Sequence, residues 1–333
     1  MVTNATNISV ARVPIFARRE SNVLDMPPND ARKTCETTRE FAMTVLNIRH
    51  TTIYRYREPV RLGPHRLMLR PRESREVRLL SSTLTLAPAA SLSWTNDVFG
   101  NAVATASFQM LTDRLTVESL AVVELGASAW PVFDIAGSAI NYPFSYSAQE
   151  WTDLGALALP QYFDASGRLA DWARGFVRGQ QTDTLSLLKD MVAGVAAWIG
   201  YQSREEEGTQ TPVQTLTRGW GSCRDFAVLF VEAARSLGFG ARIISGYLYN
   251  PELARTATAP ALVGAGSTHA WAEIFLPGAG WITFDPTNRG VGGFNLIPVA
   301  VGRVIGQVMP LTGTFLGMTD AYQGMSVDVQ VTP

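Results

Sequence analysis

The sequence predicts an α+β fold in which an antiparallel β domain precedes a helical segment and a second group of strands. Three observations support this prediction. Short β-rich segments separated by turn residues recur at roughly 8–12-residue spacing over about 44–140. Apolar residues at helical spacing then follow over 141–220. Strand-like segments return beyond residue 240 and continue to the end of the chain.

The composition excludes several classes of protein. The 333 residues allow two domains at roughly 100–200 residues each. With 28 Lys+Arg against 29 Asp+Glu, the net charge gives no electrostatic reason to expect nucleic acid or an anionic membrane as a partner. No apolar run reaches the ~20 residues of a membrane span, and residues 1–20 lack the apolar region of a secretory signal. Two cysteines fit a reducing compartment, so we expect a cytoplasmic protein.

Three segments are expected along the chain. Residues 1–42 are rich in Asn, Thr, Arg and Pro and show no sustained period, which predicts a disordered leader carrying Cys35. Residues 43–150 form the β domain, and residues 151–333 form the second part, which ends in a β tail. The change of character at Met43 predicts that the native chain starts there or that the leader is dispensable.

The most informative segment is Gly219-Trp220-Gly221-Ser222-Cys223-Arg224-Asp225-Phe226, which leads into a helical pattern that ends at Gly238. Cys223 is thereby placed at the first helical turn. The positive end of the helix dipole and the unpaired N–H groups there favour the nucleophilic thiolate form. Asp225 in the same turn is expected to cap backbone amides. An ordinary buried cysteine is the alternative.

Two alternating strands follow, and a turn at 277–280 joins them as a hairpin. His269 stands near the start of the first strand and Asp285 near the end of the second, so the hairpin brings these two together. A cysteine nucleophile, a histidine base and an orienting aspartate form the arrangement used for acyl transfer. We expect His269 to hold the Cys223 thiolate as an ion pair and then to protonate the leaving amine, while Asp285 fixes the histidine tautomer.

The residue numbers add a condition on this hairpin. His269 and Asp285 share a face only if the connecting loop has an odd number of residues or a bulge intervenes. The sequence therefore predicts a three- or five-residue loop, or a bulge. A regular four-residue loop at 277–280 would place the two side chains on opposite faces of the sheet.

These segments resemble the bacterial transglutaminase-like superfamily. The resemblance extends from about residue 43 to 333 and includes stretches of the N-terminal part at 48–56, 63–72 and 97–101, and of the tail at 299–303 and 310–314. Four ordered motifs of the second part carry it: Gly221-Ser222-Cys223-Arg224-Asp225-Phe226, Ala241-Arg242-Ile243-Ile244-Ser245-Gly246-Tyr247, His269-Ala270-Trp271-Ala272-Glu273 and Phe284-Asp285-Pro286-Thr287-Asn288.

The resemblance implies an N-terminal β-sandwich-like domain followed by a papain-like core, in which the helix bearing Cys223 packs on an antiparallel sheet bearing His269 and Asp285. It implies a thioester acyl-enzyme formed from a peptide or amide carbonyl and resolved by water, as in a peptidase or amidase. Resolution by an amine, as in a true transglutaminase, is the alternative. The Cys223 N–H and an upstream side chain would hold the oxyanion, with Tyr201 preferred to Trp198.

The expected partner is a peptide or protein substrate, and no cofactor or metal is expected. Cys223 and His269 supply two metal ligands, and no further His or Cys lies near them in the sequence. The tail departs from the family pattern at Val304-Ile305-Gly306-Gln307, so it is not expected to contribute to the site. A non-catalytic peptide-binding module is the alternative function, against which the ordered Cys, His and Asp argue. His50 and His65 are expected to be hydrogen-bonded structural residues.

Overall fold

The computed structural model describes residues 43–128, 131–204, 208–251, 262–263 and 266–333. The leader predicted for residues 1–42, with Cys35, lies outside this described part. All the described residues belong to one compact unit. No helix among them is long and apolar enough to cross a membrane.

Strand β1 organises the first sheet, because it is 24 residues long and pairs with four other strands. Its first half pairs with β5 on one side and β16 on the other, and its end pairs with β4 and β15. Register breaks after Arg55 and Leu62 let so long a strand bend. The strands are antiparallel: β1 Thr44–Leu67, β2 Val77–Ala87, β3 Ala90–Asn96, β4 Ala102–Phe108, β5 Leu111–Leu125, β15 Leu311–Leu316 and β16 Tyr322–Thr332.

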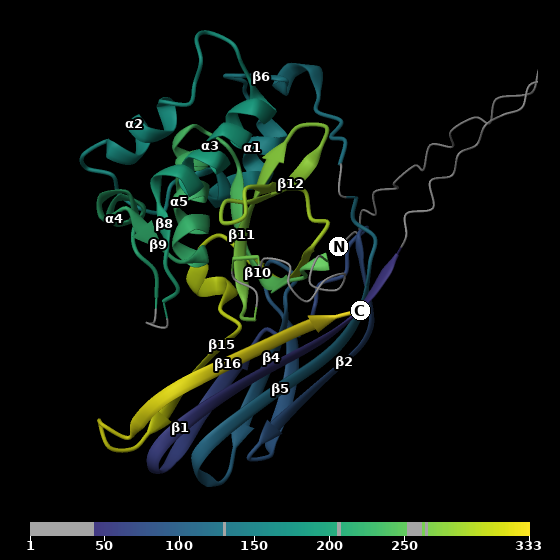
Figure 1. Cartoon of the computed structure of the whole chain (residues 1–333), viewed down its shortest axis with the longest axis vertical. Helices are drawn as coiled ribbons and strands as arrows, with labels where there is room; N and C mark the ends of the chain where they lie inside the picture. Colours follow the sequence, from purple (N-terminus) through teal and green to yellow (C-terminus); the bar gives the residue numbers. More distant parts are fainter. Residues whose placement is uncertain (1–42, 129–130, 205–207, 252–261, 264–265) are drawn as a thin grey trace, which may run out of the picture. The chain divides into compact units, whose positions relative to one another are not determined.

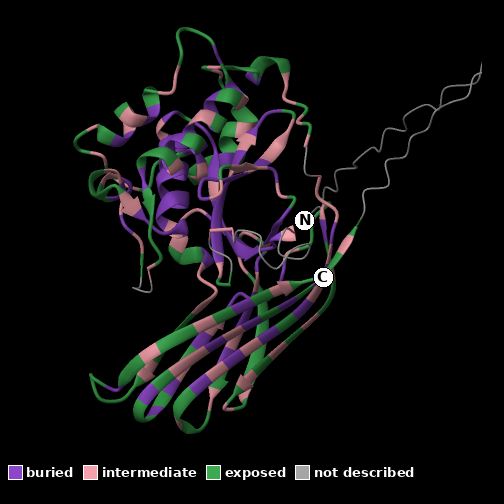
Figure 2. Cartoon of the chain, in the orientation of Figure 1, coloured by how far each residue is buried: buried purple, intermediate pink, exposed green. Residues whose placement is uncertain are grey.

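Buried and exposed residues alternate along β1 and β5, as they do in a sheet with one face in a core (Figure 2). Apolar residues from the second half of β1 and from the strands beside it share one cluster, which includes Tyr56, Leu67, Leu115 and Val117. The tail strands β15 and β16, which the sequence-based boundaries group with the second part, pair with β1 and belong to this first sheet.

The second sheet is antiparallel, with strand order β13-β12-β11-β10-β14. Helices α3 and α5 lie on one side of it, and α5 packs directly against β10 and β11 (Figure 1). The strands are β10 Ala241–Leu248, β11 His269–Leu276, β12 Gly280–Asp285, β13 Gly290–Val291 and β14 Leu296–Gly302. This arrangement confirms the predicted α+β class, with the cysteine-bearing helix packed on an antiparallel sheet.

In the sequence, the α-helices come after strand β5 and before strand β10. They are α1 Ala148–Leu154, α2 Arg168–Arg174, α3 Thr184–Trp198, α4 Pro212–Arg218 and α5 Cys223–Ser236, with 3-10 turns at Gly137–Ala139, Gly155–Ala158 and Ile305–Val308. Four strands of two residues each form two pairs. Strand β6 (Asn141–Tyr142) pairs with β7 (Thr182–Asp183), and β8 (Gly200–Tyr201) pairs with β9 (Trp220–Gly221). Helix α5 buries almost every residue, and it ends where the sequence predicts, before Gly238 at a φ of 89°.

The hairpin between β11 and β12 confirms the predicted loop. Leu276 pairs with Gly280, and the register continues without a break to Ala272 opposite Phe284, so the loop has three residues. Continued by one residue, this register sets Asp285 opposite Trp271. His269 then lies diagonally across from Asp285, on the same face of the sheet.

The two remaining histidines are hydrogen-bonded and buried in the first sheet. Nδ1 of His50 lies 3.1 Å from the Tyr247 hydroxyl of β10, and Nε2 lies 2.9 Å from Oγ1 of Thr52. Nδ1 of His65 lies 2.8 Å from the Gly63 carbonyl oxygen. Both are structural, as expected, and His50 joins the first sheet to the second.

Candidate active site

Cys223 is the first residue of helix α5, and a network around Asp225 fixes this helix start. Oδ2 of Asp225 accepts hydrogen bonds from the backbone N–H of Ser222 at 2.8 Å and from its hydroxyl at 2.9 Å. Oδ1 accepts a third from the N–H of Gln210 at 2.7 Å. Because Asp225 is buried and held on both oxygens, it fixes the backbone at the end of the helix where the N–H groups have no intrahelical partner. The Cys223 thiol is free, and the residue is 8% exposed.

His269 and Asp285 are joined directly. Nε2 of His269 lies 2.9 Å from Oδ2 of Asp285, and both side chains are almost completely buried. A carboxylate only accepts hydrogen bonds, so Nε2 carries a hydrogen and donates a hydrogen bond to Oδ2 of Asp285. The hairpin that the sequence predicts therefore brings these two residues into contact.

The site stabilises charge on both members of this pair. Burial opposes a charged imidazole, but the attraction of Asp285, its hydrogen bond and the neighbouring Cys223 thiol outweigh it and raise the pKa of His269 to about 10. Burial likewise opposes a charged carboxylate, yet His269 and the hydrogen-bond donors around Asp285 hold the pKa of this carboxyl below its usual value. The pair is therefore an imidazolium–carboxylate ion pair near neutral pH.

The second ring nitrogen of His269, Nδ1, is not bonded to Asp285. Nδ1 is buried and has no conventional hydrogen-bond partner within the described part of the chain. The Cys223 thiol interacts with the ring and contributes to its raised pKa. Since Nε2 is already bonded to Asp285, Nδ1 is the atom free to exchange a proton with sulfur.

Asn288 also supports the site, although the sequence pattern assigned it no role. Its Nδ2 donates to Oδ2 of Asp285 at 2.8 Å and to the Val263 carbonyl at 3.2 Å. The backbone N–H groups of Thr287 and Asn288 donate to Oδ1 of Asp285 at 2.9 and 3.3 Å. The carboxylate is thus held from three directions. Thr287 and Asn288, the polar residues two and three positions after Asp285, were the available signal for this clamp.

Tyr201 lies beside the start of helix α5, as the expected oxyanion role requires. Strand β8 pairs in parallel with β9 so that Tyr201 stands opposite Gly221, two residues before Cys223. Burial raises the pKa of Tyr201, and the neighbouring Cys223 raises it further. Trp198, the second candidate, is 68% exposed at the end of α3. Of the two, Tyr201 is the one that the structure couples to Cys223.

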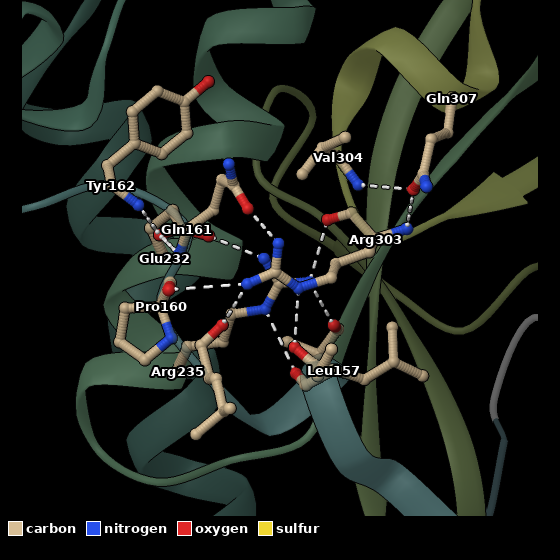
Figure 3. Close-up of polar contacts among 12 residues, drawn as sticks. Leu157, Pro160, Gln161, Tyr162, Glu232, Arg235, Arg303, Val304 and Gln307 are labelled. Atoms are coloured by element: carbon tan, nitrogen blue, oxygen red, sulfur yellow. Dashed lines mark hydrogen bonds and ion pairs between the residues drawn. The ribbon is translucent and has the colours of Figure 1, made fainter.

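A second buried ion pair anchors the far end of α5 (Figure 3). Nη1 of Arg235 lies 2.6 Å from Oε1 of Glu232, with both side chains almost fully buried. Oε2 of Glu232 accepts the backbone N–H groups of Gln161 and Tyr162 at 2.7 and 3.1 Å. Nη2 of Arg235 donates to backbone carbonyl groups, including that of Arg303 at 2.8 Å. Backbone groups from residues 161–162 and from Arg303 of the tail therefore hold the end of the helix that is remote from Cys223.

The described residues include no group of three His, Cys, Asp or Glu side chains placed to hold a metal ion. The donors gathered around Cys223 are one thiol, one imidazole and one carboxylate already bonded to that imidazole. This set is suited to moving a proton between sulfur and nitrogen.

Two regions of the chain match known protein families. Residues 46–124 match the family described as the bacterial transglutaminase-like N-terminal region, and residues 170–286 match the transglutaminase-like superfamily. An uncharacterized protein of Mycobacterium leprae (strain TN) is 26% identical over 289 residues, which cover 82% of this chain and 93% of that protein.

The fold is shared with a solved structure as well. The crystal structure of a protein regarded as a cysteine protease, from Cytophaga hutchinsonii, superposes with a TM-score of 0.66 at 19% sequence identity. The match covers 87% of this chain and 91% of that one. Both family regions occur here in the same order as the two sheets, and together they cover most of strands β1–β5, helix α5 and the His269–Asp285 hairpin. The chain is a member of the transglutaminase-like superfamily that carries the bacterial N-terminal region.

Proposed function

We propose that this protein is a cysteine-dependent acyl-transfer enzyme in which Cys223 is the nucleophile, His269 the acid–base residue and Asp285 its orienting partner. The single observation that carries the proposal is the buried 2.9 Å bond between His269 and Asp285, with the Cys223 thiol acting on the same imidazole. A buried histidine whose pKa is raised to about 10 beside a thiol is typical of a site that transfers protons, which favours an enzyme over a peptide-binding module.

The reaction starts from a Cys223 thiolate and a protonated His269, since the imidazolium is stabilised by Asp285. Sγ attacks the carbonyl carbon of a peptide or amide, and the carbonyl π electrons move to oxygen. When the tetrahedral intermediate collapses, the C–N bond breaks and Nδ1 of His269 gives its proton to the departing amine. A thioester on Cys223 and a neutral His269 remain.

A second nucleophile then resolves the thioester. Neutral His269 takes a proton from water as the water oxygen attacks the acyl carbon, and the C–S bond breaks to release a carboxylic acid and the thiolate. We propose that hydrolysis of this kind is the reaction, as in a peptidase or amidase. Protein-glutamine transamidation uses the same thioester, with an amine in place of water.

The developing oxyanion needs donors in front of the Cys223 helix. The Cys223 backbone N–H is one, because it belongs to the unpaired first turn of α5. We propose the Tyr201 hydroxyl as the second. Its pKa is raised, so it keeps its proton near neutral pH and can donate.

Alkylation of Cys223 tests the proposal without a known substrate. The purified chain is treated with iodoacetamide between pH 5 and 9, and mass spectrometry separates labelling of Cys223 from labelling of Cys35. We expect Cys223 to react at nearly full rate well below pH 8, and His269→Ala to remove this reactivity. A wild-type rate that rises like that of an ordinary thiol, with an inflection near pH 8.5, would disprove the triad.

Trapping then identifies the reaction. The acyl group captured on Cys223 from a cell extract is released with water or with a primary amine, and both products are sequenced. Free acid formed in the presence of amine supports hydrolysis, whereas quantitative transfer to the amine supports transamidation. We further propose a cytoplasmic location, on the basis of the two cysteines in the sequence, and cell fractionation with an antibody tests it.

A further inference from the structure

The turn between β3 and β4 of the first sheet, residues 97–101, reaches the second sheet and is built to keep one shape. Oδ1 of Asp97 accepts the backbone N–H groups of Phe99 and Asn101, each at 3.0 Å. The N–H of Gly100 donates to the Asp97 carbonyl at 2.9 Å, and Gly100 has a φ of 72°, which favours glycine. We refer to these five residues as the docking turn.

Asn101 connects the docking turn to the edge of the second sheet. Its side chain is fully buried, with Nδ2 donating to the Val301 carbonyl at 2.7 Å and Oδ1 accepting the Val301 N–H at 2.9 Å. Val301 lies on β14, the edge strand. The side-chain amide therefore replaces the backbone of a missing neighbouring strand. Arg72 donates to Oδ1 of Asn101 at 2.6 Å and fixes the amide orientation.

Val301, to which Asn101 is hydrogen-bonded, belongs to a row of paired residues that leads across the sheet to the active site. Val301 pairs with Ile244 on β10, and Ile244 pairs with Trp271 on β11. One step further in the same register is Asp285 on β12. Val301, Ile244, Trp271 and Asp285 are thus neighbours in one row across four strands. The Asn101 amide lies at one end of this row and the Asp285 carboxylate at the other.

Trp271 is the member of this row that contacts the base. Its ring is stacked on that of His269, with centroids 6.0 Å apart and planes 28° from parallel. Phe99 of the docking turn packs against the buried cluster that contains Trp271, Ile244 and Val301. The indole also lies close to the Gly246 backbone, since a Cβ on Gly246 would lie 2.7 Å from its Cη2 atom. The position of Trp271 therefore limits the position of the His269 ring.

We infer that the docking turn of the N-terminal domain is a positioning element of the active site, acting through Asn101 and Phe99 on Trp271 and hence on the His269 ring. The inference rests on the proposed role of His269 in catalysis. It gives the N-terminal domain a part in the reaction. A ring displaced by about 1 Å exchanges its proton with Cys223 far less efficiently.

The test compares Asn101→Ala and Phe99→Ala with Val98→Ala, a matched control in the same turn whose side chain is 94% exposed. Cys223 alkylation is measured from pH 5 to 9 on the full chain, with circular dichroism and thermal unfolding as checks of folding. We expect both test variants to remain folded and to lose Cys223 reactivity at pH 6 by about ten- to a hundredfold. The inflection moves toward pH 8.5, while Val98→Ala behaves like wild type.

A purely structural turn would give a different result. Asn101→Ala and Phe99→Ala would then lower the unfolding temperature and leave the alkylation profile of the folded protein unchanged, which would overturn the inference. If Asn101→Ala does not fold, Phe99→Ala and Phe99→Leu decide, with Leu expected to restore most of the low-pH reactivity. Failure of the proposed function is seen separately, because wild type itself would then show the profile of an ordinary thiol.

Discussion

The hydrogen bond between Nε2 of His269 and Oδ2 of Asp285 closes the open end of a hairpin whose loop is only three residues long. Because this loop has an odd length and the register has no bulge, both side chains leave the sheet on one face. The length of a surface loop thus determines whether the acid–base pair can form. The pair is also buried, so each charge depends on the other for its stability.

Replacing Asp285 with Asn removes the charge that raises the pKa of His269 and keeps a side chain of similar shape. We expect the pKa of His269 to fall from about 10 and the ring to be neutral over more of the neutral pH range. Low-pH alkylation of Cys223 and turnover of any identified substrate should decrease, turnover by about a thousandfold or more.

The control for this variant is Asp134→Asn, since Asp134 is exposed and lies outside the site. Both variants are compared for alkylation rate and for the free energy of unfolding in urea. Equal rates for Asp285→Asn and wild type at pH 6 would show that Asp285 does not act on the base.

Asn288→Ala tests the clamp on the Asp285 carboxylate. Loss of the 2.8 Å bond leaves Oδ2 bonded to His269 alone, while the backbone donors of residues 287 and 288 still hold Oδ1. We expect a fall of about tenfold in the Cys223 alkylation rate at pH 6, smaller than for Asp285→Asn. Asn288→Asp should be worse, because a second carboxylate would face Asp285. A rate for Asn288→Asp equal to that of wild type would contradict the clamp.

The sequence predicts much of this site because its determinants are local. Residues 219–226 contain both the tight entry and the capping Asp225, so they place Cys223 at a helix start without tertiary information. His269 and Asp285 both have odd residue numbers, which restricts the length of the hairpin loop if they are to share a face. The loop in the structure has three residues, one of the predicted lengths.

Other features depend on contacts between segments far apart in the chain, which no local pattern encodes. Asn101 and Val301, which are 200 residues apart in the sequence, are hydrogen-bonded. Strand β16 pairs along most of its own length with β1. The tail has ordinary β-type sequence, so its pattern predicts strands but not the sheet that they join. The role of Arg235 is of the same kind, since its partners come from three separate segments.

Arg235→Met should destabilise the protein by about 3–5 kcal/mol, because it leaves the Glu232 carboxylate buried without its cation. The double variant Arg235→Met/Glu232→Gln should recover only part of this loss. The carbonyl groups of Ala241 and Arg303, which bond to Arg235 at 2.7 and 2.8 Å, would still lack a donor. Urea unfolding monitored by tryptophan fluorescence measures the changes in free energy.

The matched control for the buried pair is Arg174→Met. Arg174 and Asp171 form an i,i+3 ion pair on α2 with side chains 62% and 69% exposed. We expect a change within about 0.5 kcal/mol, as for other exposed pairs. A loss for Arg235→Met no larger than that for Arg174→Met would show that the buried network does not stabilise helix α5.

Acid should weaken the contact that His50 of the first sheet makes with Tyr247 of the second sheet. Burial lowers the pKa of His50 to about 4, although Asp328 acts in the opposite direction. An unfolded chain has its histidine pKa near 6.5, so below that pH the unfolded state binds the proton more tightly than the folded state. The contribution of neutral His50 to stability is therefore complete above about pH 6.5 and is lost as the pH falls to about 4.

The size of this acid effect follows from the two pKa values. An interval from 6.5 to about 4, at about 1.4 kcal/mol per pH unit, corresponds to about 3–4 kcal/mol. His50→Gln cannot titrate, yet its amide can still bond to the Tyr247 hydroxyl. We expect the difference in unfolding free energy between wild type and His50→Gln to decrease by about this amount from pH 7 to pH 4. Parallel pH profiles for the two proteins would mean that His50 accepts a proton as readily in the folded protein as in the unfolded chain.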